Sequence, residues 1–259
     1  MKKLFKDIRH GDIDAVRAAI AKKPAVVNEV YDGKAPKKDV GQSPLQVAIK
    51  VGEFEIIELL LENGADPDFR EDPALVPPRS LCMSVLNDAI IGAMDSILYG
   101  NYESSRKYVG LVEELLKKGA DPNKEAIPVP DTNQYRRVPT DTLVYHASEN
   151  LSRYAKNYYS GCAEAFGISK KALFDILDLL KRYGADFDRW LDGEWGGTTN
   201  RAAFLDDFVP AADRTYEYQY RGKTFQGVVR GDVDKNQEIR AALKEYFKTG
   251  EAAEVSVHA

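Results

Sequence analysis

The most constraining feature of this sequence is a tripeptide, Gly-Ala-Asp, that occurs at residues 64–66, 119–121 and 184–186. Each copy follows aliphatic residues placed eight, seven and four positions before its glycine. This spacing puts them on one face of a helix, and glycine readily adopts the left-handed conformation that ends a helix. Each copy therefore predicts a helix with one buried face and a sharp stop, the apolar positions being Ile56, Ile57, Leu60, Leu111, Val112, Leu115, Ile176, Leu177 and Leu180.

A second helical signal precedes each of these three stretches, at 43–48, 84–89 and 142–147. Each opens on Ser or Thr, has an aliphatic residue two positions later, and has an alanine three positions after that. Ser43 can cap a helix, and Pro44 fits its first position, where a missing N–H costs nothing. The pattern therefore predicts three helical hairpins whose small alanines allow close packing.

Recurrence at this scale indicates stacked units that bury their faces against one another, rather than one closed globule. A less regular unit precedes the three hairpins within residues 2–28. Its two short predicted helices carry apolar residues at helical spacing, namely Leu4, Phe5, Ile8, Val16 and Ile20.

The stretch from 41 to 68 resembles an ankyrin repeat, a family whose pattern is T-P-L-H-x-A-A, then Gly, then an L-L-L helix, then G-A-D-P/V-N. The resemblance implies a mainly α chain, built as an ankyrin-type α-solenoid of about four repeats over residues 1–188. We place the units at about 2–30, 41–70, 82–123 and 140–188. In this alignment Gln46, Asn87 and Tyr145 occupy the histidine position of the family, which usually bridges neighbouring loops by hydrogen bonds.

The third and fourth units are longer than the family's. The glycines of successive Gly-Ala-Asp copies are 55 and 65 positions apart, against about 33 for an ankyrin repeat. Proline-containing finger loops at 69–83 and 124–139 take part of the excess length. The rest predicts lengthened helices, with turns near Gly100–Asn101 and within 160–167.

Residues 189–259 carry a weaker repeat signal and are predicted to form a C-terminal cap. Residues 199–208 suit a short helix, the alternation at 215–229 predicts a β-hairpin turning at Arg221–Gly222, and 234–248 predicts a helix with Ile239, Leu243, Tyr246 and Phe247 on one side. A separate small α+β appendage is the alternative.

Composition narrows the possible environments. The net charge is −5 and Lys and Arg are not clustered, so we expect no nucleic-acid partner. No apolar run approaches the ~20 residues that cross a bilayer, and the N-terminus lacks a signal peptide, so we expect no membrane association. The two cysteines, Cys82 and Cys162, have no metal or redox spacing. We therefore expect a cytoplasmic protein.

The sequence offers no catalytic constellation, so we expect no enzyme, no metal and no cofactor. His146, within the fourth unit, is interpreted as structural, and the acidic pairs Asp206-Asp207 and Asp232/Asp234 as helix caps or solvated residues.

Aromatic and arginine residues outside the aligned core are the best candidates for binding another protein, since Trp, Tyr and Arg dominate interaction hot spots. The candidates are Tyr31, Phe69, Arg70, Tyr135, Arg136, Arg137, Trp190 and Trp195.

The family resemblance implies a protein–protein interaction module. We expect a monomer that acts as an adaptor or inhibitor by holding a partner protein with its concave face and finger loops. The alternative is a small-molecule-binding or hydrolytic enzyme with a pocket between the last repeat and the 189–259 region, and a strongly shifted carboxylate in a closed pocket would favour it.

Overall fold

A computed structural model describes residues 2–33, 39–76, 81–128, 138–155, 162–187, 214–220, 223–229, 239 and 241–247. These residues are mainly helical, and the sheets among them have two strands each. The helices follow one another in consecutive pairs: α1 Lys2–Arg9 with α2 Ile13–Lys22, α3 Pro44–Val51 with α4 Phe54–Glu62, α5 Val85–Leu98 with α6 Tyr102–Lys117, and α7 Pro139–Ala155 with α8 Cys162–Arg182. A 3-10 helix, η1 Pro24–Asn28, follows α2.

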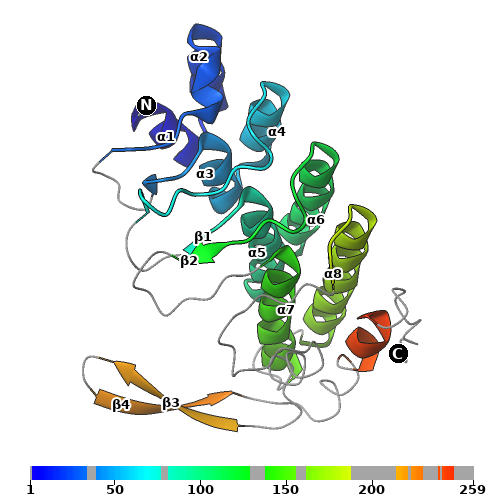
Figure 1. Ribbon diagram of the computed structural model, residues 1–259. Helices are drawn as coiled ribbons and strands as arrows, with labels where there is room; N and C mark the ends of the chain where they lie inside the picture. Colours follow the sequence, from blue (N-terminus) through cyan, green and yellow to red (C-terminus); the bar gives the residue numbers. More distant parts are fainter. Residues whose placement is uncertain are drawn as a thin grey trace.

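The pairs stack side by side in two layers (Figure 1). Helices α1, α3, α5 and α7 form an inner layer in which each packs on the next, and α2, α4, α6 and α8 form an outer layer. Within each pair the two helices also contact each other. Each hairpin therefore buries an apolar face against its neighbour, which is how a repeat array is stabilised.

The predicted stop signals sit at matching bends. Gly64, Gly119 and Gly184 have φ values of +82°, +103° and +90°, and the alanine after each donates its N–H to the carbonyl of the leucine four positions before that glycine, at 2.9, 3.0 and 2.9 Å. All nine predicted stripe residues are buried, at 5% exposed or less. The helix-plus-stop prediction is thus confirmed in all three copies.

The predicted starts hold for two of the three inner helices. Ser43 and Ser84 cap α3 and α5, each accepting a hydrogen bond at 3.2 Å from the backbone N–H three residues on. The start predicted at Thr142 is wrong, because α7 begins one turn earlier, at Pro139. A carboxylate oxygen of Asp141 accepts from the N–H of Val138 there at 3.1 Å, which supports the earlier start.

Helix length separates the early pairs from the later ones. Helices α3 and α4 have 8 and 9 residues, whereas α5 to α8 have 14, 16, 17 and 21, as the wide spacing predicted. The turn at Gly100–Asn101 is confirmed, and Asn101 caps α6. The turn predicted within 160–167 is partly wrong, because α8 begins at Cys162 and continues through Gly167. Gly167 therefore lies inside the helix, at a position where an added Cβ would meet no atom within 4 Å.

The finger loops contact each other through short strands. Strand β1, Leu81–Cys82, pairs antiparallel with β2, Ile127–Pro128, and Arg70 forms a β-bridge with Ser84. Strand β1 precedes α5 and strand β2 follows α6, so their pairing links the loop before α5 to the loop after α6.

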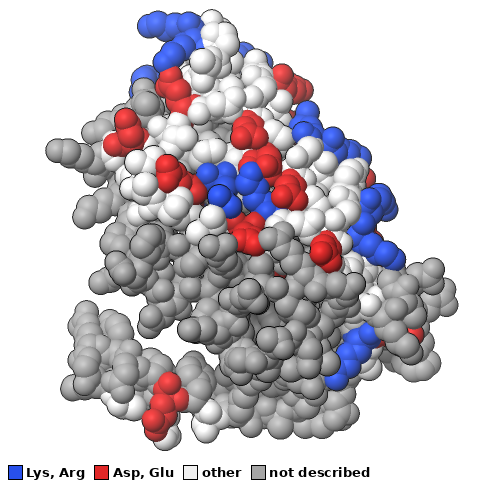
Figure 2. Space-filling model, in the orientation of Figure 1, with Lys and Arg blue, Asp and Glu red and all other residues white. Residues whose placement is uncertain are grey.

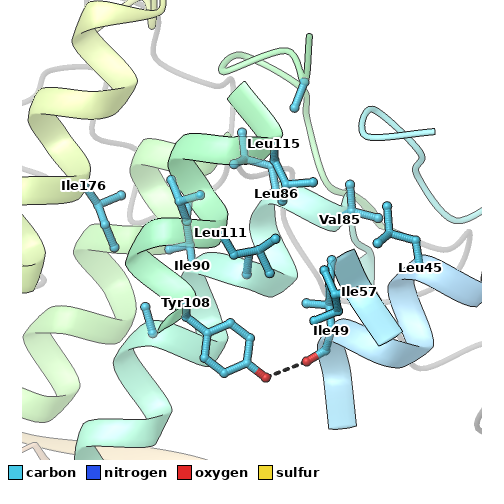
Figure 3. Packing of buried hydrophobic residues seen from close by; sticks show 14 of the residues in the cluster. Leu45, Ile49, Ile57, Val85, Leu86, Ile90, Tyr108, Leu111, Leu115 and Ile176 are labelled. Atoms are coloured by element: carbon cyan, nitrogen blue, oxygen red, sulfur yellow. Dashed lines mark hydrogen bonds between the residues drawn. The ribbon is translucent and has the colours of Figure 1, made fainter. Parts of the chain in front are cut away.

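One apolar core runs through the stack from Leu4 to Tyr246. Figure 3 shows part of it, including Leu45 of α3 and Ile176 of α8. Tyr108 of α6 reaches back to the second pair and donates its hydroxyl to the carbonyl oxygen of Ile49 at 2.5 Å. Its ring also lies against Phe54, with centroids 4.9 Å apart. The junction between a short pair and a long pair is therefore both packed and hydrogen bonded.

The C-terminal region confirms the predicted hairpin and the described part of the helix predicted at 234–248. Strands β3 Arg214–Tyr220 and β4 Lys223–Val229 form the expected antiparallel hairpin, with Glu217 opposite Gln226. Residues 239 and 241–247 are helical, and Ile239, Leu243 and Tyr246 belong to the main core. The Tyr246 hydroxyl donates to Asp178 on α8 at 2.9 Å. The short helix expected at 199–208 lies outside the described residues.

Candidate functional site

Three of the predicted binding residues lie in the described part of the chain, and Tyr31 is fully buried there. Its ring packs on Phe5 with centroids 5.0 Å apart, and its N–H donates to the Gln42 carbonyl at 2.9 Å. Burial, with the nearby Asp39 and Asp32 carboxylates, raises the pKa of its hydroxyl. Tyr31 thus anchors the connection to α3, and its side chain presents no surface to a partner.

Phe69 and Arg70 begin the loop that follows α4. Phe69 is half-buried against the core, so only part of its ring faces outward. Arg70 donates from Nη1 to the carbonyl oxygen of Glu125 at 3.1 Å, which joins this loop to the loop after α6. Its Nε is buried without a hydrogen-bond partner. Phe69 and Arg70 are consecutive residues of this loop, whereas Tyr135, Arg136, Arg137, Trp190 and Trp195 lie outside the described residues.

A buried polar cluster lies where this loop meets the inner helices. We call Gln42, Gln46, Lys50, Glu71 and Asp88 the polar joint. Glu71 accepts hydrogen bonds from the Gln42 amide and the Lys50 ammonium, both at 2.9 Å, and from the N–H of Met83 at 2.9 Å. Asp88 on α5 accepts from the Gln46 amide at 2.6 Å, and Lys50 lies 3.5 Å from the same oxygen. The joint therefore ties α3, α5 and the loop together.

The charges in the polar joint do not balance, because one ammonium faces two carboxylates. Burial lowers the pKa of Lys50, but Asp88 and Glu71 raise it more, and the net shift is upward. Burial raises the pKa of Asp88 to about 6, reinforced by Glu71 and opposed by Lys50 and the Gln46 hydrogen bond. Lys50 therefore stays protonated, which removes it as a nucleophile.

A repeated side-chain clamp holds successive Gly-Ala-Asp turns together. The Asn28 amide donates to the Gly64 carbonyl and its oxygen accepts from the N–H of Asp66, both at 2.8 Å. The Asn123 amide does the same to Gly184 at 3.0 Å and to Asp186 at 2.7 Å. This shared geometry is independent support for equivalent units, because each clamp reaches from one helix pair to the turn of the next.

The middle unit carries Asp68 at the clamp position. It still accepts from the N–H of Asp121 at 3.0 Å, and it forms an ion pair with Lys124. A carboxylate has no N–H to donate, so the second bond of the clamp is replaced by an interaction with a lysine.

Two of the predicted bridging residues bond the loops as expected. The Gln46 amide donates to the Met83 carbonyl at 3.0 Å, and the Asn87 amide approaches the Lys124 carbonyl at 3.4 Å. Asn87 also accepts from the Thr142 hydroxyl at 2.6 Å, which extends the bridge to α7. His146 meets Asp95 of α5 at 3.2 Å, a contact within the stack.

Among the described residues two large apolar side chains are exposed, Leu75 at 40% and Tyr99 at 82%. Leu75 lies in a turn in which Asp72 accepts from the N–H groups of Ala74, Leu75 and Val76. Val76 is buried against Cys82. Leu75 is thus held outward on an anchored turn, and sequence reasoning missed it because aliphatic residues are ordinarily assigned to the core.

On the described part of the face in Figure 2, a small basic group lies among acidic residues, and other Lys and Arg residues gather along the right-hand edge and at the upper left. Within the described residues no group of three or more potential metal ligands comes together. None of the described helices combines the length and apolarity needed to span a bilayer.

The stacked hairpins, the clamps between their turns and the bonds from inner helices to finger loops together define a class of protein, the helical repeat proteins. The family model of the ankyrin repeat matches residues 40–72, which contain α3, α4 and the start of the loop after α4. The chain therefore contains an ankyrin repeat at residues 40–72. A search of curated proteins found no match. Ankyrin repeats are in general protein-interaction modules.

Proposed function

We propose that this chain binds a partner protein through the inner face of its helix stack and its finger loops, acting as an adaptor or inhibitor. The observation that carries the proposal is the anchoring of the loop after α4. Glu71 and Arg70 fix its base from both sides, to α3 and to the next loop. A loop held in this way presents its outer residues with little ordering cost on binding.

The proposal treats residues 1–188 as four ankyrin-type units, two of them with lengthened helices. The matching bends and the clamp residues Asn28, Asp68 and Asn123 support this assignment, since they recur from one pair to the next. Residues 189–259 would then cap the C-terminal end. The packing of Leu243 and Tyr246 into the core supports that role.

Leu75 and Arg70 are the residues that we place at the contact. Leu75 offers an exposed aliphatic side chain, and the guanidinium of Arg70 has donors beyond the one that binds Glu125. Arginine is enriched among interaction hot spots, and the exposed Leu75 on the same anchored loop adds apolar area that a partner can bury. The alternative is an enzyme pocket between the last repeat and the 189–259 region, most of which lies outside the described residues. The buried carboxylate with a raised pKa, Asp88, lies between α3 and α5 instead.

Affinity capture with the tagged full chain from its native cell tests the proposal. We expect one stoichiometric partner, and we expect Leu75→Asp to reduce its recovery at least tenfold. Tyr99→Ser is the matched control, because Tyr99 is also exposed but lies at the far end of α5, about 20 Å from the finger loops. Recovery of no stoichiometric partner, or loss of the partner with Tyr99→Ser but not with Leu75→Asp, would contradict the proposal.

A further inference from the structure

An unsatisfied acceptor lies in the middle of the polar joint. The Gln46 side chain is fully buried, and its amide nitrogen donates both to Asp88 and to the Met83 carbonyl. These two bonds fix which end of the amide is nitrogen. The remaining atom, Oε1, is buried without any donor. A buried acceptor without a partner is destabilising, so the site favours any change that supplies a donor.

Asp88 is the neighbour that can supply that donor. Its contacts with Gln46 and Lys50 both fall on Oδ2, and its residue is 7% exposed. An ionised carboxylate only accepts hydrogen bonds, whereas a protonated one carries an O–H that donates. A carboxylic acid and a primary amide can pair through two hydrogen bonds, N–H to carbonyl oxygen and O–H to amide oxygen. Protonation would therefore complete the Gln46 amide.

We propose that Asp88 and Gln46 form a proton-gated link between α3 and α5, in which uptake of one proton by Asp88 adds a second hydrogen bond from its carboxyl group to Gln46 Oε1. No atom leaves the site in this step, because the proton comes from solvent and is shared within the pair.

The groups around Asp88 favour this proton uptake. Lys50 faces it from α3, Glu71 from the loop after α4, and Tyr108 from α6. Of these three groups Lys50 carries the positive charge, and its ammonium pairs with both Glu71 and Asp88. The joint therefore holds one surplus negative charge that a proton neutralises, and the raised pKa of Asp88, about 6, agrees with this.

The direction of the pH effect follows from the upward shift. The folded chain binds the proton below about pH 6, whereas an unfolded chain binds it only near the ordinary value of 3.8. The stabilising contribution of the link therefore grows as the pH falls from 6 toward 3.8, and it is lost as the pH rises through 6. Gln46 also donates to the Met83 carbonyl, and Glu71 accepts from the Met83 N–H, so exchange at that N–H reports opening of the link.

A titration of the full-length chain followed by carboxyl carbon NMR tests the link directly and needs no partner protein. We expect the Asp88 carboxyl signal to titrate with a midpoint near 6. A midpoint at or below about 4, the ordinary range for aspartate, would overturn the inference.

The variant Asp88→Asn supplies the missing donor permanently, since an asparagine amide can give its N–H to Gln46 and accept from it. We expect hydrogen exchange at the Met83 N–H, corrected for the intrinsic rate, to slow several-fold between pH 7.5 and 5.5 in the wild type and to be slow at both values in the variant. Glu55→Gln, which changes an exposed carboxylate on α4, is the matched control and should behave as the wild type. Exchange in Asp88→Asn that still slows on acidification as in the wild type would contradict the link. An effect of this link on partner binding rests on the proposed function, whereas these measurements do not.

Discussion

The second helix pair is short and the third and fourth pairs are long, yet all three pack into the stack in the same way. Helices α3 and α4 have 8 and 9 residues, whereas α7 and α8 have 17 and 21. Both kinds end their outer helix on a left-handed glycine and bury the same three-residue stripe before it. The stop and the stripe therefore define the unit, and the extra turns lie at the opposite end, away from the finger loops.

The sharpest test of this equivalence is to truncate the same stripe position in a short and a long outer helix. Leu60 and Leu180 are both fully buried four residues before their glycines. We expect Leu60→Ala and Leu180→Ala each to lower the free energy of unfolding by about 2–5 kcal/mol, through lost burial and the cavity left behind. Urea denaturation followed by circular dichroism measures both. A loss below about 1 kcal/mol at either site would show that the stripe is not equivalent in the two kinds of unit.

The junction between the two kinds of unit can be weakened at Tyr108. Its hydroxyl donates to the buried Ile49 carbonyl, and burial with the Asp88 charge raises the pKa of Tyr108 to about 12. Tyr108→Phe leaves that carbonyl without this donor, so we expect a loss of about 1–2 kcal/mol in unfolding free energy. Tyr99→Phe, at an exposed position, should change it by less than about 0.5 kcal/mol. Equal effects of the two variants would rule out a contribution from the junction hydrogen bond.

Replacing a glycine by alanine should lower the stability where the glycine ends a helix and raise it where the glycine lies inside a long helix. Gly64 has φ +82°, which strains any other residue, so Gly64→Ala should destabilise the chain by about 1 kcal/mol. Gly110 lies inside α6, where an added methyl group would meet no other atom within 4 Å, and Gly110→Ala should stabilise the chain by about 0.5–1 kcal/mol. Thermal unfolding of the two variants distinguishes these signs, and a gain in stability from Gly64→Ala would show that its bend is not required.

The smallest expected change in stability is at Asp68, the clamp residue that differs from the asparagines of the other units. Asp68→Asn should restore the amide donor that Asn28 and Asn123 use, while removing the ion pair with Lys124. We expect a net gain of about 0.5 kcal/mol or less at low salt, rising at high salt, because screening weakens the ion pair that is given up. The reverse exchange, Asn123→Asp, should destabilise the chain. The salt series of unfolding free energies checks both signs.

Local signals were sufficient to predict the helices, their buried faces and their stops. Ser43, Ser84 and the three Gly-Ala-Asp copies act within a few residues of themselves, so their effect can be inferred from spacing alone. The start of α7 was missed because a threonine in a familiar pattern, Thr142, resembled a cap, while Pro139 and Asp141 begin the helix one turn earlier.

The candidate site was less predictable than the fold. Tyr31 was a reasonable binding residue by type, yet it is buried against Phe5, since the connection before α3 folds back over α1. The polar joint was not foreseen, because Gln46 and Asp88 are 42 residues apart and Lys50 and Glu71 are 21 apart. Nothing in the local pattern of these residues indicates that they share one buried cluster.

The sequence by itself determined the repeating unit, because helix stops, caps and apolar stripes are short-range properties of the chain. Only the tertiary structure decided which polar residues meet between units, such as Lys50 with Asp88 or Asn123 with Gly184. Those contacts depend on how one helix pair is placed against the next, which no local pattern specifies. The ionisation of a buried carboxylate such as Asp88 depends in turn on the charges and dipoles that this packing places around it.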